Sequence, residues 1–233
     1  MSQLALPLQL DDHAVFESFL PAGNETLVAL LEETATSSAG SGCWIWGANA
    51  VGKSHLLQAV AARAGDRSAY VPLKMLAGEG PDVIEGLDQR TLVCLDDIDS
   101  VSDDDDWERA LFTLYNSLLA EQGQLIVSAG MAPRECPIRL PDLASRMSQL
   151  PTFRIAELSD SDREAALKLR SSHRGLELPD ETARYLMSRS RRDMASLYRL
   201  LDTLDQEALR AKRRLTIPFV RDVMNELSSP STR

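Results

Sequence analysis

The sequence of 233 residues has few cysteines, few histidines and no long apolar run. Cys43, Cys94 and Cys136 lie far apart and form no C-x-x-C pair, which argues against a disulfide framework and against a zinc site. No run of 18 apolar residues is present, so we expect no membrane-spanning helix. The first twelve residues lack a basic segment and contain Asp11 and Asp12, unlike a secretory signal. These absences predict a cytoplasmic protein without a histidine-rich metal site.

Charge is unevenly distributed along the chain. The net charge is -10, which disfavours broad nonspecific binding to nucleic acid. Residues 1–150 hold 22 acids and 9 bases, a balance of -13, whereas residues 151–233 hold 13 acids and 16 bases, a balance of +3. This difference favours two units with different surfaces. The alternative is that one acidic loop at residues 103–106 supplies much of the excess.

Short apolar segments alternate with helical patterns in the first two thirds of the chain. Helices are expected at residues 25–34, 53–63 and 107–121. Strands are expected at residues 43–46, 68–73, 91–95, 125–127 and 153–155. Continuous apolar strands that alternate with helices indicate βαβ units, and therefore an α/β fold with a parallel five-stranded sheet between helices.

The pattern changes after residue 157, where only helices are expected. A signal resembling a helix cap, Leu158-Ser159-x-x-Asp162, begins this part. The expected helices cover residues 160–173, 180–190, 193–212 and 217–227. We therefore predict an extended arm at residues 1–12, an α/β domain at 13–157 and a small helical domain at 158–233.

A phosphate-binding loop is the most specific motif in the sequence. It matches G-x-x-x-x-G-K-[ST], between an expected strand and an expected helix. Glycines allow close approach, backbone N–H groups and the helix N-terminus face the phosphates, and the lysine supplies a full charge. The predicted nucleotide-binding residues of this segment are Gly47, Ala48, Asn49, Ala50, Val51, Gly52, Lys53, Ser54 and His55.

Acidic residues follow the strand expected at residues 91–95. Asp96 and the Ser54 hydroxyl are predicted to hold Mg²⁺, and Asp97 to orient the attacking water. Asp97 has an alternative role as a solvated loop acid. Ser128 ends the next expected strand, where it either approaches the nucleotide or caps a turn.

This combination resembles the AAA+ ATPases, and within them the DnaA clade. Residues 16–24 are similar to the F-x-x-F-x-x-G-N entry segment, which implies that Phe16, Phe19 and Asn24 lie at the nucleotide base. Residues 140–146 resemble the segment whose arginine acts in trans, so Arg146 is the implied arginine finger; the alternative is a surface pair with Asp142. The resemblance also implies that Arg192 reaches the nucleotide from the helical lid.

The N-terminus and the length point to the Hda family within this clade. Residues 3–8 resemble its clamp-binding peptide, and the chain ends without the DNA-binding domain of DnaA. The implied function is an ADP-bound, or ATP-bound, regulator of replication initiation with Mg²⁺. It binds the β subunit of the DNA polymerase sliding clamp, stimulates hydrolysis of DnaA-bound ATP and associates with the nucleoid through the clamp. The implied clamp-binding residues are Gln3, Leu4, Leu6, Pro7 and Leu8; alternatively, these leucines pack on their own domain.

Two departures and two alternatives stay open. Ser128 is followed by Ala129-Gly130 rather than an acid, and Asp97 stands where AAA+ motors commonly carry Glu, which favours slow intrinsic hydrolysis. The sequence alone does not decide between a regulator and an autonomous P-loop ATPase or small-molecule kinase. A DNA-binding adaptor or loader is the third hypothesis, although no sequence-specific DNA binding is expected. Self-association is also left open.

Overall fold

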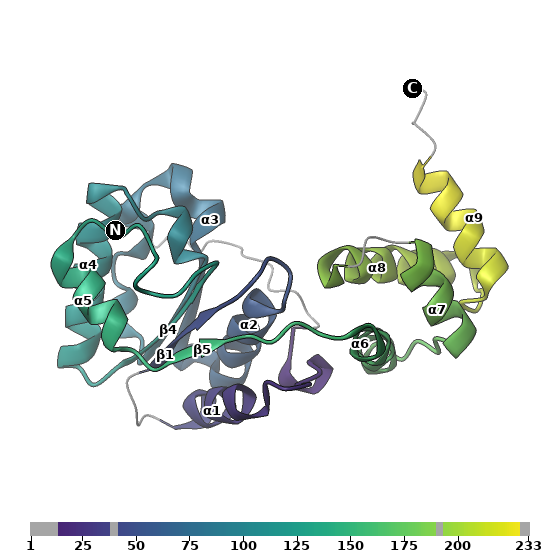
Figure 1. Cartoon of the computed structure of the whole chain (residues 1–233), viewed down its shortest axis with the longest axis horizontal. Helices are drawn as coiled ribbons and strands as arrows, with labels where there is room; N and C mark the ends of the chain where they lie inside the picture. Colours follow the sequence, from purple (N-terminus) through teal and green to yellow (C-terminus); the bar gives the residue numbers. More distant parts are fainter. Residues whose placement is uncertain (1–13, 38–41, 190–192, 229–233) are drawn as a thin grey trace. The chain divides into compact units, whose positions relative to one another are not determined.

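The structure, a computed structural model, describes residues 14–37, 42–189 and 193–228 (Figure 1). The chain divides into two compact units. The first comprises Met1–Phe16 and Gly23–Ala156, and the second comprises Glu17–Ala22 and Glu157–Arg233. The main division thus falls next to the place where the sequence pattern changes from alternating strands and helices to helices alone.

A parallel five-stranded sheet forms the centre of the first unit. Its strand order is β2-β3-β4-β1-β5, and every neighbouring pair is parallel. The strands are β1 (Gly42–Trp46), β2 (Ser68–Pro72), β3 (Leu92–Asp96), β4 (Gln124–Ala129) and β5 (Thr152–Arg154). The predicted fold class is therefore confirmed, with strand ends that lie within two residues of the expected ones.

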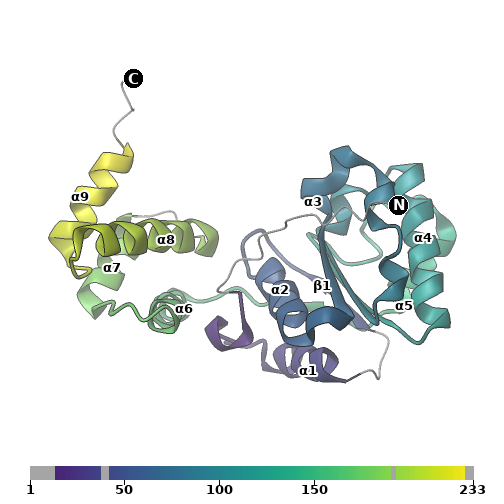
Figure 2. The ribbon, with the colours of Figure 1, turned by 180° about the vertical axis from the view of Figure 1, so that it is seen from behind.

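Helices cover both faces of this sheet, as Figures 1 and 2 show. One face carries α1 (Glu25–Thr36) and α2 (Lys53–Ala64), and the other carries α3 (Leu73–Leu76), α4 (Asp105–Ala120) and α5 (Pro141–Gln149). Side chains alternate between the two faces. Trp44 and Val93 join the core under α4 and α5, whereas Cys94 and Ile126, also fully buried, belong to the opposite face.

Three local predictions were incomplete. The acidic segment 103–106 is only partly a loop, because the Asp104 carboxylate accepts hydrogen bonds from Asp106 N and Trp107 N and caps α4. Asp105 and Asp106 then lie in the first turn, where negative charge is favourable. The sequence analysis also assigned no helix to α5 and none to the 3-10 turns at Ala77–Glu79, Pro81–Ile84 and Leu87–Gln89. Such short turns have too few residues for a periodic apolar pattern.

The second unit is built from four helices in its described part. They are α6 (Asp160–His173), α7 (Asp180–Arg189), α8 (Met194–Ala211) and α9 (Ile217–Ser228), close to the predicted ranges. The Ser159 hydroxyl accepts a hydrogen bond of 3.2 Å from Asp162 N and caps α6. Leu167, Leu201 and Val220 are fully buried in the core of this unit. Among the described helices, none is long and apolar enough to cross a bilayer.

Candidate nucleotide-binding site

The phosphate-loop motif forms a tight turn between β1 and α2. Gly52 has a φ of 107° and Ala50 a φ of 63°, so the loop uses the left-handed region twice. A Cβ at Gly47 would lie 3.3 Å from Val51 Cγ2 and 3.4 Å from the Ile155 carbonyl oxygen, which leaves little room for any other residue. The loop therefore has the curvature that exposes successive backbone N–H groups at the start of a helix.

Lys53 is a buried cation at the N-terminus of α2. It is 5% exposed, and its Nζ donates hydrogen bonds to the carbonyl oxygens of Gly47 (3.0 Å) and Ala48 (3.1 Å). Within the described residues no carboxylate lies at ion-pair distance from it. A buried charge is normally compensated by an opposite charge. The positive end of α2 and Lys53 together therefore fit an anion such as a phosphate group.

Strand register brings three polar side chains to the α2 face of the sheet. Asp96 lies two residues after Cys94 on β3, and Ser128 lies two residues after Ile126 on β4, so all four side chains share one face. Tyr70 on β2 pairs with Cys94 and belongs to the same face. Because parallel strands end at the same edge, Asp96 and Ser128 meet there.

Both oxygens of the Asp96 carboxylate are held by hydroxyl groups. Tyr70 donates to Asp96 Oδ2 at 2.7 Å, and Ser128 donates a short hydrogen bond to Asp96 Oδ1. Burial, together with the nearby Asp96 carboxylate, raises the pKa of Tyr70 far above its usual range. The phenol is therefore protonated at neutral pH and acts as a donor.

Asp97 has a different environment from Asp96. It has a φ of 57°, and its backbone N–H donates to Ser128 Oγ at 2.9 Å. Burial raises the pKa of the Asp97 carboxyl group, Asp96 adds to this effect, and Lys53 opposes it. Asp97 is half-buried, and its carboxyl group interacts electrostatically with Lys53. A carboxyl group at this position can orient a water molecule and accept its proton.

Other predicted nucleotide contacts lie near the ends of α1 and α2. The Asn24 side chain accepts from Ala156 N at 2.7 Å and donates to the Ala156 carbonyl at 3.3 Å, which joins the start of α1 to the segment after β5. His55 Nε2 lies 2.8 Å from the Val15 carbonyl oxygen. The ring of Phe16 is buried, with the Arg63 guanidinium 4.6 Å from its centroid.

One predicted residue lies in the second unit, and others lie outside the described residues. Phe19 lies in Glu17–Ala22, which is part of the second unit. Arg192 and the predicted clamp-binding residues 3–8 lie outside the described residues. Their predicted roles are therefore not addressed by this geometry.

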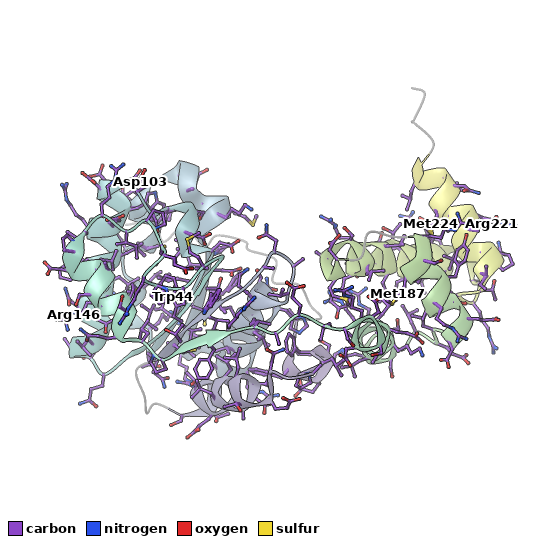
Figure 3. All side chains as sticks on the ribbon, in the orientation of Figure 1. Trp44, Asp103, Arg146, Met187, Arg221 and Met224 are labelled. Carbon is purple, nitrogen blue, oxygen red and sulfur yellow. The ribbon has the colours of Figure 1, made fainter. Side chains whose placement is uncertain are left out.

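Arg146 lies on α5, far along the chain from the phosphate loop (Figure 3). Its guanidinium carbon is 5.9 Å from the centroid of the Tyr115 ring on α4. In the part of the chain that the structure describes, Arg146 forms no ion pair, so the alternative pair with Asp142 is absent. The Arg146 side chain is partly exposed on α5.

Glu108, which the sequence analysis did not identify, anchors the segment that leads into α5. This carboxylate is 1% exposed. Its Oε1 accepts from Asp103 N and Arg139 N, both at 3.0 Å, and its Oε2 accepts from Leu140 N at 2.6 Å. In the sequence, the one local sign of this role is a glutamate at an apolar position of the expected helix. That position does not show which backbone N–H groups the carboxylate binds.

Tyr70 and Gln58 were also missed as parts of the site. Gln58 Nε2 on α2 donates to the Tyr70 hydroxyl at 3.2 Å, and Tyr70 donates to Asp96. The spacing along the chain carries no sign of this connection. It depends on β2 lying next to β3 and on α2 covering both strands.

These features define a class, the P-loop proteins of the AAA+ fold with a helical lid. Domain III of the replication initiation protein DnaA from Thermotoga maritima is similar with a TM-score of 0.78 and 16% identity, over 94% of this chain and 99% of that chain. AMPPCP-bound DnaA from Aquifex aeolicus has a TM-score of 0.66 and 21% identity, over 84% of this chain and 66% of that one. The RuvB motor of Thermotoga maritima has a TM-score of 0.58 and 17% identity, over 88% of this chain and 68% of that chain.

Family models add a more particular assignment for each unit. Residues 160–224 match the family model of the Hda lid domain, so the helical unit is similar to that lid domain. Residues 43–121 match a family model described as RNA helicase. This second match spans the phosphate loop and the acidic end of β3, the parts that P-loop proteins share.

Proposed function

We propose that this chain is a nucleotide-bound regulator of replication initiation that acts on DnaA. The nucleotide part rests on Lys53, a buried cation at the N-terminus of α2 whose hydrogen bonds, among the described residues, go to carbonyl oxygens alone. The Hda-type lid and the DnaA domain III fold support the regulatory part. The proposed nucleotide is ADP, with ATP as the other ligand of the same site.

The chain's own residues have distinct roles in this proposal. Backbone N–H groups of residues 48–54 and Lys53 bind the phosphates. The Ser54 hydroxyl and Asp96 hold Mg²⁺, which supplies charge neutralisation at the phosphates. Asp97 orients water at the end of β3. Its side chain is one methylene shorter than glutamate, which supports slow intrinsic hydrolysis.

The lid and the entry segment complete the proposed site. Phe16, Phe19 and Asn24 bind the base side of the nucleotide, and Arg192 reaches the phosphates from the lid. The boundaries that we propose remain an arm at residues 1–12, a nucleotide-binding domain at 13–157 and a lid at 158–233.

Arg146 is proposed to act outside its own chain. It inserts into the nucleotide site of DnaA and stabilises negative charge on the phosphoryl group as ATP is hydrolysed there. Its partial exposure on α5 and the absence of an ion-pair partner among the described residues support this role. Residues 3–8 are proposed to bind the sliding clamp as an extended peptide, which brings the chain to DNA without a sequence-specific DNA contact.

Nucleotide binding is tested first, by isothermal titration of ADP into the intact chain and into Lys53→Ala. The expected result is binding that falls at least tenfold in the variant, because one buried charge partner of the phosphates is lost. Lys168→Ala, a change at a lysine on α6 that pairs with Glu164 and Asp180, is the matched control. Equal ADP affinity in all three proteins would contradict the proposed site.

Regulation is tested with DnaA-bound ATP, DNA-loaded clamp and this chain in one reaction. We expect faster ATP loss only when all components are present, and no acceleration by a chain without residues 1–8. Fast ATP turnover by this chain alone would instead favour the autonomous ATPase, the alternative that the Asp96 and Asp97 pair supports. Salt-dependent DNA binding without the clamp would favour the adaptor hypothesis.

A further inference from the structure

A group of basic side chains lies where α8 ends and α9 begins, within the second unit. This group, which we call the basic corner, consists of Lys212, Arg213, Arg214 and Arg221. All four residues are exposed. Arg221 lies on α9 (Figure 3), four residues after Ile217, so it shares a helical face with the residue at which α9 leaves the turn.

The backbone of the basic corner is tied to the end of α8 by hydrogen bonds. Lys212 N donates to the Leu209 carbonyl at 3.3 Å, and Arg213 N donates to the Ala208 carbonyl at 3.0 Å. Lys212 has a φ of 52°, so it ends the helix in the left-handed region. The Arg213 guanidinium carbon lies 4.9 Å from the centroid of the buried Phe219 ring. The cations therefore project from an ordered turn.

None of these four cations has an ion-pair partner among the described residues. The neighbouring Arg210 differs, because its guanidinium pairs with Glu207 on the same helix at 2.7 Å. The C-terminus of a helix favours positive charge, but this effect is confined to the last turn. Arg213, Arg214 and Arg221 lie beyond the last turn of α8. The helix end therefore does not account for the concentration of charge.

The charge of this segment is opposite to that of the whole chain. Residues 207–222 hold five bases and two acids, a balance of +3, whereas the chain carries -10. A polyanion is therefore attracted to the basic corner, while the net charge of the chain opposes its approach. Such a small patch gives weak affinity by itself. It becomes effective when a second contact already holds the chain beside the polyanion.

Duplex DNA fits the basic corner better than an acidic protein surface does. The centre of a protein interface is normally apolar. Among the described residues 209–221, Leu209 is the one exposed large hydrophobic residue. Contacts with DNA phosphates need exposed lysine and arginine side chains, and they are independent of base sequence. The planar guanidinium groups of three arginines suit phosphate oxygens in particular.

We propose that the basic corner contacts the phosphate backbone of the duplex on which the sliding clamp is loaded. The inference rests on the proposed clamp binding by residues 3–8 and adds to it a second contact, made by the lid. The clamp contact raises the local concentration of DNA at the basic corner, so the weak electrostatic contact strengthens retention on the loaded clamp.

The test compares binding of the intact chain to the free clamp and to the clamp loaded on duplex DNA, by biolayer interferometry. The measured quantity is the dissociation constant for the free clamp divided by that for the loaded clamp. We expect a ratio of at least about ten at low salt, because two contacts act in one complex. The ratio should fall between about 50 and 200 mM salt, because the DNA contact releases counterions.

Two variants with equal charge test whether the basic corner is responsible. The corner variant replaces three of its cations: Lys212→Gln, Arg213→Gln and Arg214→Gln. Its ratio should fall towards one, with unchanged affinity for the free clamp. The control variant loses the same charge at three exposed arginines outside the basic corner: Arg109→Gln, Arg134→Gln and Arg199→Gln. Its ratio should match that of the intact chain.

A double variant covers the case in which the corner variant does not fold. Arg213→Gln removes the contact with Phe219 as well as a charge. Lys212→Gln combined with Arg214→Gln keeps that contact. For this pair, the salt slope of binding to the loaded clamp should fall by about one for each cation removed.

The outcomes separate this inference from the proposed function. If the intact chain does not bind the free clamp, the proposed clamp contact is wrong. If it binds the free and the loaded clamp equally, or if the corner variant keeps the ratio of the intact chain, the DNA contact is overturned. An equal loss of affinity for both forms of the clamp would mean that the basic corner binds protein, and this would also overturn it. A control variant whose ratio falls as far as that of the corner variant would do the same.

Discussion

The buried carboxylate of Glu108 accepts a hydrogen bond of 2.6 Å from the backbone N–H of Leu140, 32 residues further along the chain. Leu140 immediately precedes α5, the helix that carries Arg146. The same carboxylate also accepts from Asp103 N and Arg139 N. One side chain on α4 thus satisfies three backbone donors from two segments and fixes the start of the Arg146 helix.

Removal of the Glu108 carboxylate is expected to destabilise the first unit strongly. Each buried donor left without an acceptor costs about 1–3 kcal/mol. Glu108→Ala should therefore lower the free energy of unfolding by at least about 3 kcal/mol. Glu108→Gln keeps one acceptor oxygen, so its free energy of unfolding should fall by less. Urea unfolding followed by circular dichroism measures both changes.

Glu121→Gln provides the control for Glu108, since Glu121 is exposed at the end of α4. Its effect is expected to stay within about 0.5 kcal/mol. A Glu108→Gln variant as stable as Glu121→Gln would show that the three hydrogen bonds contribute little.

Arg146 can be tested separately from nucleotide binding. Arg146→Ala should keep ADP affinity and lose the stimulation of hydrolysis in DnaA, because an arginine finger contributes about 10³–10⁵ in rate. Arg146→Lys should recover little, since a single ammonium does not reproduce the planar fork. Single-turnover hydrolysis of DnaA-bound ATP is the measurement.

Arg109→Ala is the control for Arg146, because Arg109 is an exposed arginine on α4 whose ion-pair partners in the described structure are two acids of its own helix. We expect it to stimulate DnaA normally. Unchanged stimulation by Arg146→Ala would refute the finger.

The charged form of Asp97 is expected to lower the free energy of unfolding at neutral pH. Its pKa in the folded chain is raised above the ordinary 3.8, chiefly by burial and then by Asp96. The stability associated with the protonated form is therefore present at acid pH and is lost as the pH rises through the folded pKa. Asp97→Asn avoids this loss and tolerates the positive φ. The variant should unfold at a higher temperature near neutral pH, and its advantage should shrink as the pH falls towards 3.8.

Thermal unfolding at a series of pH values measures this difference. Asp88→Asn, at an exposed position, should show no such pH-dependent gain. If Asp97→Asn is less stable than the unaltered chain near neutral pH, the charged Asp97 carboxylate stabilises the fold and the expectation is wrong.

The three cysteines are free and buried, and their reactivity should reflect that burial. Desolvation raises the pKa of Cys43 to about 12 and raises the pKa of Cys94 further, so little thiolate is present at neutral pH. Cys136 has 8% exposure, and Ser102 lies 3.3 Å from its sulfur. We expect Cys136 to be alkylated first in the native protein, and Cys43 and Cys94 only on unfolding. Mass spectrometry of tryptic peptides after timed labelling measures the order, and early labelling of Cys94 would contradict it.

The sequence was informative wherever the signal is local. Continuous apolar runs marked the strands, and helical spacing marked α4 and the lid helices. The G-x-x-x-x-G-K-[ST] motif marked the start of α2. In each case the residues that carry the signal lie within one turn or one strand of each other. Local signals can also mislead, as at Asp104. An acidic run is interpreted as a loop unless its role as the cap of the following helix is recognised.

Contacts between distant segments could not be predicted in the same way. Tyr70 and Asp96 are separated by 26 residues, and Ser128 and Asp96 by 32. Their meeting depends on the order β2-β3-β4 and on strand register. A shift of one residue in register would turn Tyr70 to the other face of the sheet.

By itself, the sequence determined the class of fold, the position of the phosphate loop and the presence of an acidic pair at a strand end, because apolar periodicity and loop glycines act over a few residues. Only the tertiary structure decided that Lys53 forms no ion pair with a described carboxylate and that hydroxyl groups donate hydrogen bonds to both oxygens of Asp96. It also decided that Glu108 accepts hydrogen bonds from the segment before α5. The reason is that a buried polar group takes its partner from whichever strand or loop packs beside it, and that neighbour is set by the global arrangement of the chain.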